Sequence, residues 1–97
     1  MVRRVGVRIL GLTSVEEELI EMKLALSAKL RKTRESGNLT QTALAKRMGS
    51  SQSRIAKMEA GDPSVSLDLL VQGLLAAGAT RRQIANAMGQ RKKAVGE

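Results

Sequence analysis

The sequence predicts an all-α protein, a compact bundle of five helices formed by a single domain. Five segments carry apolar residues at spacings of three and four, and each follows a Ser or Thr suited to cap a helix. Period-2 alternation, the pattern of a strand, occurs only in a short N-terminal stretch. The chain has 97 residues, and a chain of this size buries roughly 60 to 65% of its unfolded surface, which allows one modest core.

The N-terminal segment, residues 1–13, is predicted to be a strand-like arm. Val5, Val7 and Ile9 alternate with basic residues and glycine. One strand cannot form a sheet alone, so the segment could pair with its copy in a dimer, add to the sheet edge of a partner, or stay a loose arm. The sequence leaves these three alternatives open.

The first helix is predicted to be unusually long, from Ser14 to the break at Ser36-Gly37-Asn38. Thr13 and Ser14, followed by glutamates, form two overlapping capping-box candidates. Acidic residues gather near its start and basic residues near its end, which suits the helix dipole. One apolar stripe about four turns long is predicted on this helix, and it consists of Val15, Leu19, Met22, Leu26 and Leu30.

Four shorter helices are predicted after it. Their expected caps and bounds are Thr40 for Gln41–Met48, Ser51 for Gln52 to about Ala60, Ser66 for a helix that stops at Gly78, and Thr80 for Arg81–Met88, which Gly89 closes. The domain is therefore expected over residues 14–89, followed by a basic mobile tail over residues 90–97. Four apolar residues of the last two helices could serve either the core or a subunit contact, and the core is favoured: Leu67, Leu70, Leu74 and Ile84.

The composition disfavours catalysis. The chain has no Cys and no His, which removes disulfides, thiolate metal sites, the commonest metal ligand and the usual general base near neutral pH. We therefore expect no enzyme, no catalytic residue, no metal site and no cofactor. A nucleic-acid-modifying enzyme is the weakest alternative, because the acidic residues lie mostly at the start of the first helix. The absence of Cys favours a reducing cytoplasm as the location.

The charge of the chain indicates a polyanionic partner. Seventeen Lys and Arg against nine Asp and Glu give a net charge of +8. Phe, Tyr and Trp are absent, so the stacking platforms that bind single-stranded nucleic acid are absent too, and duplex DNA is favoured. A membrane partner is not expected, because no run of eighteen apolar residues exists and the basic residues do not lie opposite one broad apolar face. The basic start of the chain lacks a cleavage pattern, so we expect no signal peptide.

The second and third helices have the spacing of two short helices that cross at a tight turn. Such a pair needs a small residue at the crossing, a residue tolerant of positive φ in the turn, and an apolar anchor on the second helix. Ala45, Gly49 and Ile55 occupy these positions when counted from Gln41. Further apolar contacts on the inner side are expected from Leu44 and Met58.

Together these residues resemble a known family. The pattern Gln41-x3-Ala45-x3-Gly49-Ser50-Ser51-Gln52-x2-Ile55-x2-Met58-Glu59-x-Gly61 is similar to the helix-turn-helix of the Cro and phage-repressor class, called the XRE family. The resemblance covers about residues 26 to 78. It implies a lambda-repressor-like bundle of about five helices whose third helix enters the major groove of DNA, commonly as a twofold dimer on a palindrome.

The resemblance also implies which residues bind DNA. It assigns base contacts to Ser51, Gln52, Ser53 and Lys57, phosphate contacts to Gln41 and Arg54, and a structural ion pair to Arg34 and Glu59. Gln52 could bind adenine, and Lys57 could bind guanine O6 or N7. The alternatives are an ordinary solvated helix face and a surface ion pair of negligible energy.

The sequence therefore predicts a double-stranded DNA-binding regulator, a homodimeric repressor of a palindromic operator. Residues 40–97 carry 9 cations and 4 anions, a net +5, against +3 for residues 1–39, so the proposed DNA-binding half is the more basic. The extended first helix also suggests an alternative, because small XRE-type proteins of this form resemble the antitoxins of HigBA-type pairs. Such an antitoxin would neutralise a small toxin protein and repress its own operon.

Overall fold

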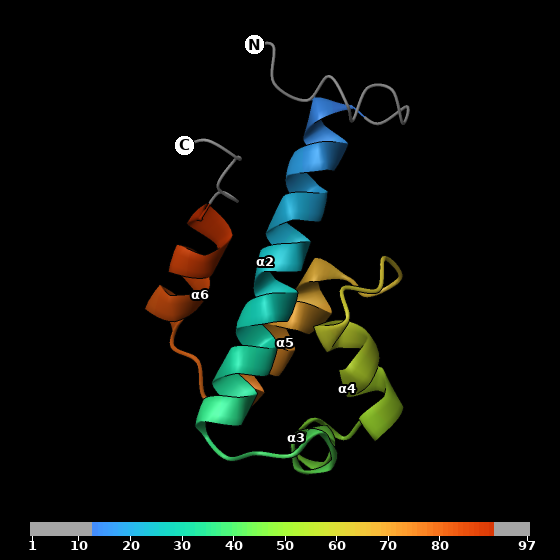
Figure 1. The fold of residues 1–97 in the computed structure, drawn as a ribbon, viewed down its shortest axis with the longest axis vertical. Coiled ribbons are helices and arrows are strands. Elements are labelled where there is room, and N and C mark those ends of the chain that lie inside the picture. The colour runs from blue at the N-terminus through green and yellow to red at the C-terminus, as the bar shows by residue number, and fades with distance from the viewer. Residues whose placement is uncertain (1–12, 91–97) are drawn as a thin grey trace.

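The computed structural model describes residues 13–90, which form five α-helices around one core (Figure 1). The predicted all-α class is confirmed for this part of the chain. The predicted arm and basic tail lie outside the described residues, apart from Thr13 and Gln90.

The longest helix, α2 (Ser14–Ser36), runs along the length of the molecule (Figure 1). The predicted capping box is present at its start. The Thr13 N–H donates to Glu16 Oε1 at 2.8 Å, and the Glu16 N–H donates to Thr13 Oγ1 at 3.0 Å. The helix ends at Ser36 with Gly37 as its C-cap, within the break that the sequence predicts.

Four short helices surround the C-terminal part of α2. They are α3 (Gln41–Met48), α4 (Gln52–Glu59), α5 (Leu67–Ala77) and α6 (Arg81–Gly89). The four predicted N-caps are confirmed, because the side chains of Thr40, Ser51, Ser66 and Thr80 each accept a hydrogen bond from the backbone N–H three residues later. In Figure 1, α6 and α4 lie on opposite sides of α2, and α3 lies near its C-terminal end.

The expected end of the last helix is wrong by one residue. Gly89 belongs to α6, and Gln90 is the C-cap with an extended backbone. A glycine closes a helix most often by adopting a left-handed conformation, as Gly78 does after α5 with a φ of 104°. Gly89 is not among the positive-φ glycines of the described residues, so it continues the helix.

The core lies where α2, α3, α4 and α5 meet. Its fully buried side chains are Leu26, Leu30, Leu44, Ile55, Met58, Leu70 and Leu74. The residues left open between core and subunit contact belong to the core: Leu70, Leu74 and Ile84 are buried, and Leu67 is half-buried against them.

The predicted apolar stripe along α2 is buried in the core only in its second half. Leu26 and Leu30 are 0% exposed, whereas Leu19 is 44% and Val15 is 77% exposed. Figure 1 shows the reason, because the N-terminal turns of α2 project beyond the ends of the other labelled helices. The periodicity of a helix marks an apolar face, but the length of its neighbours decides how much of that face is buried.

Candidate nucleic-acid interface

The α3 and α4 helices form a tight two-helix unit whose inner side is apolar. Leu44, Ile55 and Met58 are 0% exposed, and Ala45 is 3% exposed. Gly49 joins the helices with φ 65° and ψ 38°, the left-handed conformation that disfavours every residue with a Cβ. Four of the five residues predicted to build a helix-turn-helix are thus buried on the inner side of this unit, and Gly49 lies in the turn.

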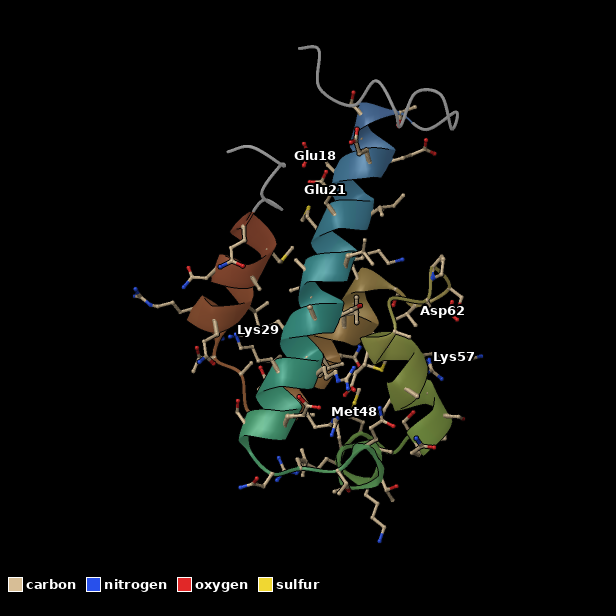
Figure 2. The ribbon with its side chains drawn as sticks, in the orientation of Figure 1. Glu18, Glu21, Lys29, Met48, Lys57 and Asp62 are labelled. Atoms are coloured by element: carbon tan, nitrogen blue, oxygen red, sulfur yellow. The ribbon has the colours of Figure 1, made fainter. Side chains whose placement is uncertain are left out.

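The outer side of the same unit is polar and exposed. All of the residues predicted to contact DNA from α4 and its cap are exposed: Ser51, Gln52, Ser53, Arg54 and Lys57. Figure 2 shows the Lys57 side chain pointing away from the bundle. Because Ile55 and Met58 hold the rear of α4, its hydrophilic side is free to meet a ligand.

A shallow cleft lies beside α4. Its volume is about 300 Å³, and it is lined by Ser51, Ser53, Arg54, Lys57, Ser64, Val65 and Leu69. The last three residues come from the α4–α5 loop and the start of α5, and the sequence analysis did not assign them to the site. The Asp62-Pro63-Ser64 sequence is typical of a turn in which the Asp side chain holds the residue two positions later, so the fixed position of Ser64 could have been predicted. In the structure, Asp62 Oδ1 accepts hydrogen bonds from the Ser64 N–H at 2.8 Å and from Ser64 Oγ at 2.7 Å. These bonds lower the pKa of Asp62 below its usual value.

An ion pair joins α2 to the C-terminal end of α4. Arg34 donates through Nε to Glu59 Oε2 at 2.5 Å and through Nη2 to Glu59 Oε1 at 2.9 Å. The two side chains are only 11% and 4% exposed, so the pair that the resemblance implies is buried rather than a surface contact. Arg34 Nη1 also donates to the carbonyl of Leu39 at 2.9 Å, which fixes the segment before α3.

The pKa of Glu59 reflects this environment. Burial alone would raise the pKa, but the hydrogen bonds from Arg34 and Gln41 and the nearby positive charge outweigh it, and the pKa lies below its usual value. The pKa of Arg34 is raised, mainly by its hydrogen bond to Glu59. Glu59 is therefore a charged, acceptor-only group at neutral pH.

The charge on Glu59 sets the orientation of two glutamine side chains. Gln41 Nε2 donates to Glu59 Oε1 at 3.1 Å, because an ionised carboxylate can only accept. The carbonyl end of Gln41 is thereby directed at Gln52, and its Oε1 accepts from Gln52 Nε2 at 2.6 Å. A chain of hydrogen bonds thus links Gln52, at the exposed start of α4, through Gln41 to Glu59, which also accepts from Arg34 of α2.

These hydrogen bonds indicate a role for Gln41 beyond the one that the resemblance implies. The resemblance assigns its side chain to a DNA phosphate, yet in the structure both ends of its amide bind protein side chains. Its phosphate contact stays a prediction. The structure adds a second role, since Gln41 positions the amide of Gln52.

Within residues 13–90, no group of three or more acidic side chains is placed to hold a metal ion. The same residues contain no helix long and apolar enough to cross a membrane.

Comparison with protein families places a match in the middle of the chain. Residues 30–72 match a family model described as helix-turn-helix. The matched segment runs from the C-terminal part of α2 into α5 and includes α3 and α4 entirely. Comparisons with curated proteins and with solved structures gave no significant match.

Proposed function

Because residues 30–72 form a DNA-binding helix-turn-helix of the XRE type, we propose that this chain is a sequence-specific transcriptional repressor that binds a palindromic operator as a homodimer. The observation that carries the proposal is the division of α4 into a buried apolar rear and an exposed polar front. A helix that reads bases must offer hydrogen-bonding groups on one side and be held rigidly on the other.

Gln52 is the proposed centre of base readout. With one N–H of Nε2 given to Gln41, its second N–H and its Oε1 can bind N7 and the N6 amino group of one adenine. Lys57, five residues further along α4, can donate to guanine O6 or N7. Ser51 and Ser53 are proposed as smaller base contacts, and Arg54 is proposed to bind phosphate.

Selection of bound duplexes from a random pool tests this proposal. We expect a palindromic consensus, because a twofold dimer reads the same half-site twice. On that duplex, Gln52→Ala should cost about 1 to 3 kcal/mol and leave non-specific affinity unchanged. Arg54→Ala should weaken binding to all duplexes alike and lower the slope of affinity against salt by about one unit.

A matched control is Arg81→Ala. Arg81 is an exposed cation of α6, which lies on the other side of α2 from α4 (Figure 1), so its removal should leave operator affinity nearly unchanged. Equal losses for Gln52→Ala on every duplex, or a loss for Arg81→Ala as large as that for Arg54→Ala, would contradict the assigned roles.

The antitoxin alternative uses the same DNA-binding surface and adds a protein partner. The projecting first half of α2, which lies outside the matched segment, favours it as a place where another protein could dock. Co-expression with the reading frame next to the gene tests the alternative. Co-purification of a small protein whose toxicity this chain suppresses would support it, and survival of cells that express the neighbour alone would oppose it.

A further inference from the structure

The first half of α2 presents an apolar face that no described helix covers. Val15 and Leu19 are 77% and 44% exposed, and Met22 is half-buried. At 3.6 residues per turn these three side chains fall within an arc of about 60°, on the same stripe as the buried Leu26 and Leu30. The face is therefore a continuation of the core surface of α2 beyond the other helices.

We propose that a second copy of this chain covers this face, with the two α2 helices antiparallel and the twofold axis beside Leu19. The inference rests on the proposed function, because a palindrome-reading protein needs a twofold interface. It assigns that interface to a surface separate from both the core and α4.

The sequence of this face is complementary to itself in that register. An antiparallel pair centred on Leu19 brings together residues whose numbers add to about 38. Leu19 then meets its own copy, and Val15 lies within one residue of the level of the partner's Met22. The face thus pairs apolar residues with apolar residues along its whole length.

Charges on one edge of the face have a complementary arrangement. Glu16 and Lys23 lie within about 20° of each other around α2, on one edge of the apolar stripe. In the same register Glu16 lies within one residue of the level of the partner's Lys23, and the twofold axis repeats this pair. Lys23 Nζ donates to the carbonyl of Pro63 at 3.0 Å and has further N–H groups for a carboxylate.

The proposed interface leaves α4 uncovered. Arg34, which binds Glu59 of α4, lies about 60° around α2 from Leu19, and Leu24, which lies beside Gly61 after α4, lies about 140° away. Leu19 itself lines a pocket with Gly61 and Pro63 of the α4–α5 loop, so the docked helix would lie next to that loop. It would leave α4 uncovered because α4 lies further along α2, near the level of Leu30.

The spacing of the two recognition helices also fits. Met58 of α4 and Leu30 of α2 meet at Gly73, so α4 lies near the level of Leu30. Leu30 is eleven residues beyond Leu19, about 16 Å at the rise of an α-helix, so the axis places the two α4 helices about 33 Å apart along α2. Half-sites one turn of DNA apart need about 34 to 36 Å.

Sedimentation equilibrium of the full chain tests the interface. The wild type should be a dimer at micromolar concentration, and Leu19→Glu should raise the dimer dissociation constant at least about 100-fold, because two carboxylates would be buried in an apolar contact. The control is Leu75→Glu, since Leu75 is also an exposed leucine, 51% exposed, but lies on α5. It should remain dimeric, and circular dichroism should show that both variants are folded.

A cysteine variant locates the axis. The chain has no Cys, so Leu19→Cys introduces a single thiol. A residue beside the twofold axis faces its own copy within the distance a disulfide spans, so mild oxidation should give a covalent dimer. Leu75→Cys should stay monomeric on a denaturing gel under the same conditions.

Any one of three results would overturn the interface. These are a monomeric wild type, a Leu19→Glu variant that still dimerises, and equal cross-linking of the two cysteine variants. The proposed function is tested separately by Gln52→Ala on the selected duplex. If sequence-specific binding depends on Gln52 but substitution of Leu19 leaves the dimer dissociation constant unchanged, the interface is refuted and the proposed function stands. Loss of sequence-specific binding by the wild type would refute the proposed function itself.

Discussion

Removal of one member of the Arg34–Glu59 pair should destabilise the protein far more than removal of both. The perturbations are Arg34→Met, Glu59→Leu and the double variant. Each single change leaves one charge where side chains are at most 11% exposed. The cost of an uncompensated buried charge is about 3 to 5 kcal/mol, whereas an exposed pair is worth about 0 to 1 kcal/mol.

For Arg34→Met, the structure favours a loss of stability near the upper end of the range for a stranded buried charge. The Glu59 carboxylate, 4% exposed, would keep only the hydrogen bond from Gln41, and the bond from Arg34 to the carbonyl of Leu39 would also be lost. In the double variant no charge is stranded and apolar side chains of similar volume fill the space, so it should be more stable than either single variant. Since domains of this size have about 5 to 15 kcal/mol in total, the single losses are large enough to measure.

Urea unfolding at pH 7, followed by circular dichroism at 222 nm, provides the free energies for a double-mutant cycle. We expect a coupling energy of about 2 kcal/mol or more in favour of the pair. Single losses below about 1 kcal/mol would show that the pair behaves as a solvated surface contact. A double variant whose loss equals the sum of the two single losses would refute the argument about stranded charge. The folded double variant should still lose discrimination at the base read by Gln52, because nothing then orients Gln41.

Three further predictions concern single positions. Because the folded pKa of Glu59 is lowered, its stabilising contribution is complete above the unfolded pKa of about 4.3 and is lost as the pH falls through the lower folded pKa. The urea midpoints at pH 7 and pH 3 should therefore differ more for the wild type than for Glu59→Gln. Equal differences for the two proteins would contradict this prediction. Gly49→Ala should lower the free energy of unfolding by about 1 to 2 kcal/mol, because Gly49 has a φ of 65°. Gly89→Ala lies within α6 and has open space around the new Cβ, so it should be neutral or slightly stabilising. Equal losses for the two variants would indicate that backbone strain is not the cause. Thr40→Ala removes the cap of α3, which accepts a hydrogen bond from the Ala43 N–H, and should lower the free energy of unfolding by about 1 kcal/mol in the same assay. An unchanged free energy of unfolding would show that this hydrogen bond does not stabilise the protein.

The sequence predicted the order and nearly all the bounds of the described helices because their signals are local. A Ser or Thr cap bonds the backbone three residues later, and a glycine in the turn is required by its own φ, so neither depends on distant parts of the chain. The helix-turn-helix itself was predictable for a related reason. Ala45, Gly49 and Ile55 lie within eleven residues, where spacing alone fixes which side chains meet.

What the sequence missed depends on more than one element. The continuous stripe from Val15 to Leu30 gave no sign that its first half is uncovered, because periodicity reports the face of α2 but not the reach of the helices beside it. The order of the hydrogen-bond chain was equally hidden. Gln41 and Gln52 are oriented by a carboxylate at the far end of α4, which is itself held by an arginine of α2. Local chemistry fixes where each helix begins and ends, whereas burial and the direction of a side-chain hydrogen bond exist only once three helices have been brought together.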